Sequence, residues 1–149
     1  MAAQDNVALV RSQIDLYNSH QSDPAWLDKK FAILAEDCEI TDVPSGTTYR
    51  GADGFKQNSR FFTDAFPDNS MEITNVVATE DQVVVEFIGR GTHTGPLHMP
   101  TGDIPPTGRK GELRCCNVYQ ISNVKIVSLR SYYDATTMLQ QLGLAPATK

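Results

Sequence analysis

The stretch Gln82–Thr94, QVVVEFIGRGTHT, contains the most hydrophobic run of the 149-residue chain. Every second side chain from Val83 to Phe87 is apolar, and Glu86 lies between them on the opposite face. This period of two is typical of a β-strand that packs one face on a core. His93 continues the apolar face at the point where the run ends. We therefore expect a core strand here, with His93 at the rim of the hollow that this face encloses.

Segments rich in β-branched and aromatic residues occur before and after this strand. They are Met71–Glu80, Gly111–Gln120 and Val124–Tyr133, and short turns such as TEDQ and SN join some of them. Runs joined by short turns pair antiparallel, so the pattern predicts an antiparallel sheet of four strands. The segment Gly95–Lys110 is rich in Pro and Gly, and we expect a constrained loop there rather than a flexible linker.

The N-terminal third shows helical periodicity instead. Apolar residues recur at spacings of three and four in Asn6–His20, and Asp23 can cap a second helix that extends to Leu34. A third helix is expected at residues 51–68, where a proline stops it, and a short final one at residues 135–145. The chain thus has helices gathered mainly before a sheet, in one domain spanning residues 1–149.

A short strand at Cys38–Val43 lies between these helices. Alternation puts Cys38, Ile40 and Asp42 on one face of it. Helices followed by a curved antiparallel sheet indicate an α+β roll, in which the sheet wraps the helices. The cup between the sheet and the helices is then the natural ligand site.

Composition excludes several function classes. Hydrophobic residues make up 40% and charged residues 21% of the chain, and the net charge is −5 without any basic cluster. We therefore expect no nucleic-acid or anionic-membrane partner. No apolar run approaches the roughly 20 residues needed to cross a bilayer. The first residues do not resemble a signal peptide, so we expect a cytoplasmic protein.

The cysteines and histidines point to neither disulfides nor metal. An odd number of cysteines does not fit a disulfide framework, so free thiols are expected. The histidines do not combine with carboxylates or cysteines at ligand-like spacing, so no metal site is expected. The residues concerned are Cys38, Cys115, Cys116, His20, His93 and His98.

The last predicted strand has two faces of different character. Arg130, Tyr132 and Asp134 share one face, while the alternate residues, which include Leu129 and Tyr133, share the other. Burying three unpaired polar side chains would be costly. The first set therefore either faces solvent, which the residues alone favour, or converges on a polar pocket.

The span from Gly91 to Leu144 resembles the C-terminal half of SnoaL-like proteins. These form the ester-cyclase and polyketide-cyclase branch of the superfamily that includes nuclear transport factor 2 and ketosteroid isomerase. The resemblance rests on GTHTGP, IPPTGR, KI, YYD and LGL in this order. The N-terminal half is similar more loosely, through LYNSH, LAEDCEITDVP and YRGADGF.

This resemblance implies a cone-shaped α+β barrel that forms a homodimer through its sheet and needs no metal or organic cofactor. It further implies that Asp134, which matches the family's last-strand aspartate, is the general acid/base of an intramolecular aldol ring closure. His93 would be a supporting donor, and the substrate would be a small hydrophobic carbonyl compound. The other side chains that we expect around such a substrate are Tyr17, Asp42, Phe87, Asn117, Arg130 and Tyr132.

An aldol closure needs a group that removes a proton beside a carbonyl and later returns one to the new alkoxide. A carboxylate does both when burial raises its pKa toward the working pH. The enolate oxygen needs a hydrogen-bond donor, for which His93, Tyr132 and Tyr17 are candidates. Plainer roles compete with these: Asp134 can cap the final helix, and His93 can anchor a loop at a strand end.

Two further alternatives stay open. CEITDVPSG is similar to the ketosteroid isomerase segment that holds the general base, and Asp42 takes that position, with Tyr17 near the donor tyrosine. The strand RCCNVYQ, however, lacks the second acid of that site. It has Asn117 where relatives often carry His or Asp, and an amide orients a ligand but takes no proton. The second alternative is a non-catalytic module that binds a hydrophobic ligand or serves dimerisation.

Overall fold

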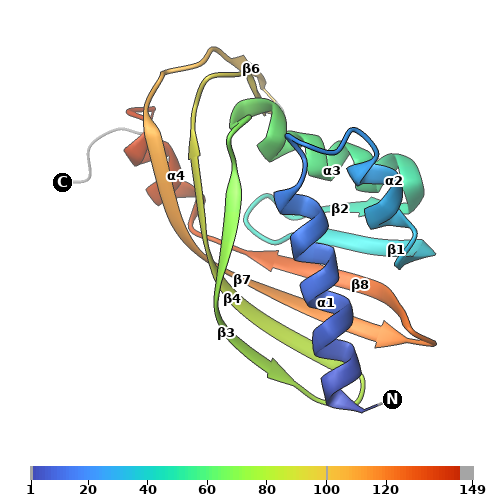
Figure 1. The fold of residues 1–149 in the computed structure, drawn as a ribbon. Helices are drawn as coiled ribbons and strands as arrows, with labels where there is room; N and C mark the ends of the chain where they lie inside the picture. Colours follow the sequence, from blue (N-terminus) through green and yellow to red (C-terminus); the bar gives the residue numbers. More distant parts are fainter. Residues whose placement is uncertain (1, 100, 145–149) are drawn as a thin grey trace.

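A curved six-stranded sheet forms the frame of the computed structural model, which describes residues 2–99 and 101–144 (Figure 1). Its strand order is β2-β1-β8-β7-β4-β3. The strands of this sheet are β1 (Leu34–Asp42), β2 (Thr47–Arg50), β3 (Ser70–Ala78), β4 (Gln82–Thr92), β7 (Lys110–Ser122) and β8 (Lys125–Tyr132). The helices are α1 (Ala3–Asn18), α2 (Trp26–Phe31), α3 (Gly51–Ala65) and α4 (Ala135–Gln141). The predicted α+β class is confirmed.

The antiparallel strands follow the prediction. β4 pairs with β7 along its whole length, from Gln82 opposite Gln120 to Thr92 opposite Lys110, and β3 and β8 flank this pair. β1 was not predicted to join them as it does: it lies parallel to β8, with its last residue, Asp42, opposite Ser131. This parallel pairing brings the ends of two strands distant in sequence to one place.

The loop predicted at residues 95–110 contains a small hairpin of its own. β5 (Leu97–Met99) pairs antiparallel with β6 (Gly102–Ile104), apart from the main sheet. Residue 100, which lies between them in the sequence, is outside the described residues. The loop packs closely on α3, because a Cβ atom on Gly95 would overlap the backbone oxygen of Asp64. Only glycine therefore fits at that position without a shift of the backbone.

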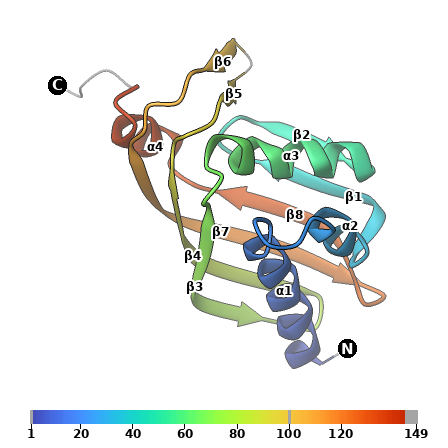
Figure 2. The same cartoon turned by 45° about the horizontal axis from the view of Figure 1, so that its top comes forward.

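Helices α1, α2 and α3 lie on one side of the curved sheet (Figures 1 and 2). α1 packs against β3 and β4, and α3 packs against β1 and β2. The buried residues of α1 include Val10, Ile14 and Tyr17, at the three- and four-residue spacing that predicted the helix. The concave side of the sheet and these helices thus form the predicted cup.

The second helix is shorter than predicted. Asp23 does accept a hydrogen bond from the backbone of Ala25 at 2.9 Å, but α2 ends at Phe31. Leu34 starts β1 instead, because it pairs with Ile126 of β8 and is buried there. The final helix also ends early, at Gln141, followed by Gly143 with a φ of +72°. Residue 145, the last of the predicted helix, is outside the described part of the chain.

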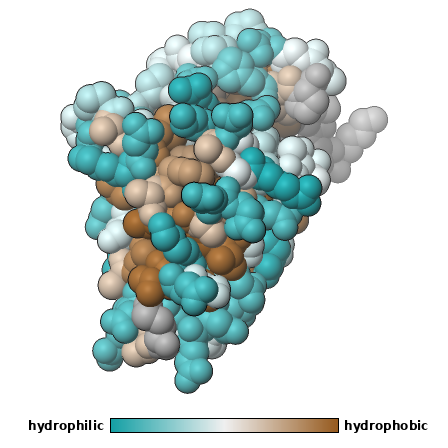
Figure 3. All heavy atoms as spheres, turned by 90° about the vertical axis from the view of Figure 1, so that its right-hand side faces the viewer, coloured by the Kyte–Doolittle hydropathy of each residue, from teal (hydrophilic) through white to brown (hydrophobic). Residues whose placement is uncertain are grey.

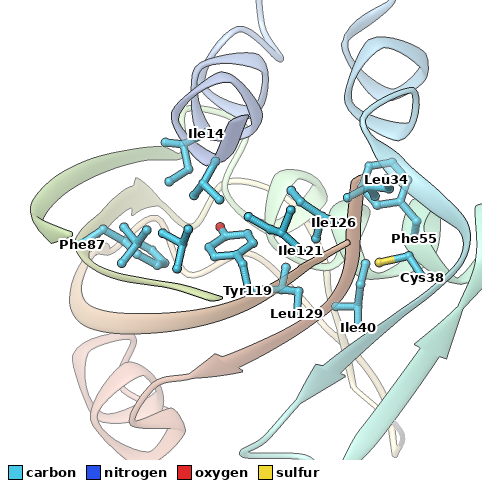
Figure 4. Packing of buried hydrophobic residues seen from close by; sticks show 13 residues of the cluster. Ile14, Leu34, Cys38, Ile40, Phe55, Phe87, Tyr119, Ile121, Ile126 and Leu129 are labelled. Carbon is cyan, nitrogen blue, oxygen red and sulfur yellow. The ribbon is translucent and has the colours of Figure 1, made fainter. Parts of the chain in front are cut away.

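The main core fills the space between α1 and the sheet. Ile14 of α1 lies next to Tyr119 of β7, and Phe87 of β4 extends the layer (Figure 4). Val83 and Val85 are completely buried, as the alternation in β4 predicted. Each such side chain contributes about 1.5–3 kcal/mol when fully buried.

A second apolar cluster closes one end of the cup. Phe66, which follows α3, packs there with Leu97 of β5 and with Met138 and Leu142 around α4. α4 is thereby held beside the ends of β4 and β7. On the molecular side turned to the viewer in Figure 3, hydrophobic atoms gather in the middle and hydrophilic residues surround them. The expected homodimer stays a prediction.

Candidate active site

The cup contains a cavity of about 120 Å³ between the inner face of the sheet and the helices. This is similar to engineered apolar cavities of about 150 Å³ that bind benzene. Apolar side chains from three strands form much of its wall, among them Phe87, Leu113 and Leu129. Polar side chains from separate elements, among them Asp42 of β1 and Asn117 of β7, also line it, and an apolar wall with polar groups set into it is typical of a site for a small organic molecule.

Asp42 is the buried acid of this cavity. It is the last residue of β1, and the alternation that buries Cys38 and Ile40 turns its side chain inward as well, leaving it 5% exposed. The Tyr133 hydroxyl donates a hydrogen bond to its Oδ2 at 2.8 Å. Its Oδ1 is buried and makes no hydrogen bond within the described residues.

Burial raises the pKa of Asp42 above its ordinary value, and the Tyr133 hydroxyl and the Ser45 backbone N–H offset part of this rise. A carboxylate needs strong hydrogen bonding or a nearby cation to stay ionised when buried. No ion pair holds Asp42 in the described part of the chain. The group is therefore set up to exchange a proton closer to neutral pH than an exposed aspartate does.

A chain of hydrogen bonds crosses the floor of the cavity. Ser131 Oγ donates to Asn117 Oδ1 at 2.7 Å, and Asn117 Nδ2 donates to the Tyr119 hydroxyl at 3.1 Å. The Tyr119 hydroxyl in turn donates to Gln13 Oε1 at 3.2 Å. These bonds satisfy polar groups in the floor, which accounts for an amide at position 117. Asn117 lies in the cavity wall as expected, and its role toward a substrate stays a prediction.

Tyr17 of α1 also lines the cavity. Asn69 Nδ2 donates to its hydroxyl oxygen, whereas no acceptor for the hydroxyl proton is found in the described residues. Burial raises the pKa of Tyr17, so the hydroxyl keeps its proton across the physiological range. Tyr17 is therefore a neutral donor that is available to a ligand oxygen.

Sequence reasoning missed Lys30. This residue of α2 is 6% exposed and lines the cavity, with its ammonium group beside the rings of Tyr17, Phe55 and Trp26. Burial lowers the pKa of Lys30 to about 7. The one available signal was its position four residues after Trp26, which puts both on the same helix face. Tyr133, which directly follows β8, was missed as well, although the alternation put it on the face opposite Arg130, Tyr132 and Asp134.

Asp134 does not lie in the cavity. Its side chain is exposed and caps α4, with Oδ1 accepting from the backbone of Thr137 at 3.1 Å and Oδ2 from the Thr137 hydroxyl at 2.7 Å. These hydrogen bonds lower the pKa of Asp134. The expectation that this acid lies inside the hollow is therefore wrong, and the plainer capping role describes its contacts.

Arg130 and Tyr132 are on the same outer side of β8 as Asp134. Tyr132 is 40% exposed, its hydroxyl accepts a hydrogen bond from Arg130 Nε at 3.3 Å, and neither residue lines the cavity. The placement of these two residues around a substrate is thus also wrong. The inner side of β8 is formed by Leu129 and Ser131, which line the cavity together with Tyr133, the residue directly after the strand.

His93 is buried behind the wall rather than in it. Its ring lies against Phe66, with centroids 5.5 Å apart, and its Nδ1 accepts a hydrogen bond from the Thr107 backbone at 3.2 Å. Its own backbone exchanges hydrogen bonds with Gly108 and Arg109. Burial lowers the pKa of His93. The residue thus anchors the loop 95–110, and the expectation that it lies at the rim of the cup is wrong.

No group of three or more His, Cys, Asp or Glu side chains that could hold a metal ion occurs among the described residues. Within the same residues, no helix has both the length and the apolar character that a membrane span requires. All three cysteines are free thiols.

The fold and the cavity together define a class of protein, an α+β cone with an internal cavity. The family model of SnoaL-like polyketide cyclases matches residues 8–142. The chain therefore belongs to the SnoaL-like polyketide cyclase family. Among curated proteins, no sequence matches it significantly.

Solved structures agree with this assignment. IdmH of Streptomyces antibioticus, assigned as a polyketide cyclase, is 27% identical with a TM-score of 0.71, over 92% of this chain and 97% of IdmH. A protein of Jannaschia sp. CCS1 assigned as a SnoaL-like polyketide cyclase is 17% identical with a TM-score of 0.83, over 97% and 95% of the two chains. A protein of Catenulispora acidiphila with a ketosteroid isomerase-like fold is 17% identical with a TM-score of 0.69, over 89% and 93%. The predicted cone-shaped fold is confirmed.

Proposed function

We propose that this chain is a cofactor-independent enzyme that removes a proton beside the carbonyl group of a small hydrophobic compound, with Asp42 as the base. The observation that carries the proposal is the buried Asp42 carboxyl, of which one oxygen has a hydrogen-bond donor and the other has none in the described chain. An oxygen without a partner in an apolar cavity is costly unless a ligand uses it. The apolar wall and the cavity volume set the size and polarity of that ligand.

The reaction that suits this arrangement best is an intramolecular aldol closure. Asp42 takes a proton from the carbon beside one carbonyl, and the electron pair of the broken C–H bond forms the enolate. The enolate carbon then attacks a second carbonyl of the same molecule, and the new alkoxide takes the proton back from the Asp42 carboxyl. No oxidant or cofactor enters this sequence, and the cavity wall holds the substrate folded for ring closure.

Tyr17 supports the enolate in this proposal. Its hydroxyl keeps its proton and has no acceptor in the described residues, so it can donate to the enolate oxygen. Tyr133 is instead engaged with Asp42 and acts on the base rather than on the substrate. The base and the donor come from β1 and α1, on different walls of one cavity.

A second candidate uses the same two residues. An isomerase that moves a double bond beside a carbonyl also needs one carboxyl that takes and returns a proton and one donor to the dienolate. The common cavity of Asp42 and Tyr17 favours this candidate over one based on Asp134. Product analysis separates the two: a substrate with a single carbonyl can isomerise, but only a substrate with two can close a ring by aldol addition.

The test uses acetophenone in D2O as the probe. NMR measures how fast the hydrogens on the carbon beside its carbonyl group exchange for deuterium. This probe has one ring and needs no ring closure, so it reports proton removal alone. We expect the wild type to accelerate the exchange and Asp42→Asn to lose at least about 100-fold of that acceleration. Asp134→Asn is the matched control, because it changes an acid outside the cavity and should retain the wild-type rate within about twofold.

Two results would overturn the proposal. One is an Asp42→Asn variant that is folded and exchanges as fast as the wild type. The other is a loss confined to Asp134→Asn. A folded wild type that binds acetophenone, detected by chemical-shift changes, yet does not accelerate exchange would favour the non-catalytic binding module instead.

A further inference from the structure

Lys30 is a buried amine that the proposed proton transfer does not use. It is the last residue but one of the short helix α2, and only 6% of its surface is exposed. Its side chain contributes to the wall of the same cavity that Asp42 and Tyr17 line. An unpaired lysine in such a place is rare, because burial of an ammonium ion is costly.

Aromatic rings, not carboxylates, surround its amine. The Nζ atom lies 4.6 Å from the ring centre of Tyr17, 5.3 Å from that of Phe55 and 5.8 Å from that of Trp26. No carboxylate in the described residues is within ion-pair distance of it. Ring faces attract a cation more weakly than a carboxylate does and replace little of its hydration. The ammonium ion therefore loses its proton more easily than that of an exposed lysine, and the pKa of about 7 agrees with this.

The neighbouring residue shows the contrast within one chain. Lys29 precedes Lys30 directly, yet its side chain is 57% exposed and its Nζ lies 2.6 Å from Asp23 Oδ2. Lys29 is thus solvated and paired, as lysines in proteins ordinarily are. Two lysines that are adjacent in sequence therefore have opposite surroundings, and the helix places only Lys30 in the cavity.

We propose that Lys30 is a nucleophilic amine that forms an imine with an apolar aldehyde or ketone bound in the cavity. A neutral amine in a hydrophobic pocket is the arrangement that activates lysine toward carbonyl groups. The Tyr17 hydroxyl belongs to the same group of side chains and can polarise the carbonyl oxygen through a hydrogen bond. This inference goes beyond the proposed function, because imine formation requires no proton transfer by Asp42.

The step balances without a further reactant. The Nζ lone pair attacks the carbonyl carbon, a C–N bond forms, and the carbonyl oxygen is protonated to give a carbinolamine. The C–O bond then breaks, and the oxygen leaves as water with the two hydrogens that the amine has lost. The product is the imine, and nothing is oxidised or reduced. An apolar ligand with more than one carbonyl group would in this way be attached at one carbonyl while another reacts.

Reductive trapping tests the inference on the full chain. The protein is incubated at pH 7 with benzaldehyde and sodium cyanoborohydride, which reduces an imine to a stable benzylamine, and the modified lysines are located by peptide mass spectrometry. An ordinary lysine is neutral in only about 1 of 2,500 molecules at this pH, whereas an amine with a pKa near 7 is neutral in about half. We expect Lys30 to be benzylated at least about 10-fold faster than Lys29.

The pH dependence provides a readout that a merely structural lysine would not give. The ratio of the labelling rate at Lys30 to that at Lys29 should fall as the pH rises above about 7, because an amine that is already neutral gains no more of its neutral form while an ordinary lysine continues to gain it. Lys30→Met, which keeps an apolar side chain of similar length, should remove the fast-labelled site and leave Lys29 unchanged. Labelling of Lys29 as fast as Lys30 in the wild type would overturn the inference, and this comparison needs no variant to fold. Failure of the acetophenone exchange would leave the trapping result standing, so the two proposals are tested separately.

Discussion

The acid and the amine of this cavity are both buried, but the protein surrounds them differently. Asp42 receives a hydrogen bond from Tyr133, whereas Lys30 has three ring faces near its Nζ and no ion pair within the described residues. Burial moves the pKa of each toward neutrality, upward for Asp42 and downward for Lys30. A direct pair would instead hold both groups in their charged forms. Two groups kept apart can therefore each exchange a proton, which a salt bridge would prevent.

The sheet keeps them apart. β1 begins beside α2 at Leu34 and runs nine residues to Asp42, which is roughly 26 Å of extended chain. Lys30 precedes this strand and Asp42 ends it. The amine and the acid therefore come to the one cavity from elements at opposite ends of β1.

The largest effect is expected for Lys30→Met at the amine end. The native pKa of about 7 against 10.5 in an exposed lysine corresponds to about 4 kcal/mol of destabilisation at pH 7. Because the native pKa is the lower one, this cost is absent above pH 10.5, grows as the pH falls to 7 and is constant below. Repacking around Met reduces the gain, so we expect the variant to be about 2–4 kcal/mol more stable at pH 7.

Denaturant unfolding at pH 7 and pH 10 measures this difference. The advantage of Lys30→Met should shrink markedly at pH 10, where the wild type is relieved of most of the cost. A variant that is less stable than the wild type at pH 7 would show that the three rings and the ammonium ion are a net stabilising cluster. A gain in stability together with the loss of benzaldehyde trapping would indicate that the lysine is retained for its reactivity.

A smaller effect is expected for Tyr133→Phe at the acid end. The Tyr133 hydroxyl lowers the pKa of Asp42, so its removal should raise that pKa further. A hydrogen bond of about 1 kcal/mol corresponds to roughly 0.7 pH units. Since the ionised carboxylate is the base, acetophenone exchange in the variant should be about fivefold slower on the acidic limb of the pH–rate profile and unchanged on the plateau.

Tyr132→Phe is the matched control for this experiment. Tyr132 is the preceding residue, but it lies on the outer side of β8 and its hydroxyl contacts Arg130. Its removal should leave the acidic limb in place. An equal shift in both variants would mean that the hydroxyl of Tyr133 does not act through Asp42.

The residues show why much of the fold could be predicted and part of the site could not. The alternation in β4 and in β1 depends on local periodicity, and it correctly put Val83 and Val85 on the core face and Asp42 on the same face as Cys38 and Ile40. The parallel pairing of β1 with β8 joins strands about 90 residues apart, and no local pattern reports it. Lys30 was not predicted to line the cavity, because lysines are almost always exposed in folded proteins. No pattern in the sequence shows that a cavity encloses this one.

Asp134 shows the opposite failure. The residues of β8 alone favoured solvent for Arg130, Tyr132 and Asp134, and the structure agrees. The family resemblance placed Asp134 inside instead. At this point β8 ends and α4 begins, so the free backbone N–H groups of the helix start compete for the carboxylate. A matching residue type was therefore not enough to fix the direction of the side chain.

The smallest effect is expected at this outer acid. Asp134→Ala removes the acceptor for the Thr137 backbone and hydroxyl and should cost about 1 kcal/mol of stability. For a chain of this size that is a fall in Tm of roughly 2–4 °C. Asp134→Asn is the control, because asparagine caps helices about as well as aspartate, and it should cost only a few tenths of a kcal/mol. Differential scanning calorimetry of the two variants measures both values. If alanine and asparagine lowered the Tm equally, the negative charge rather than the hydrogen bonds would hold α4 in place, and the lowered pKa of Asp134 would then reflect the helix dipole.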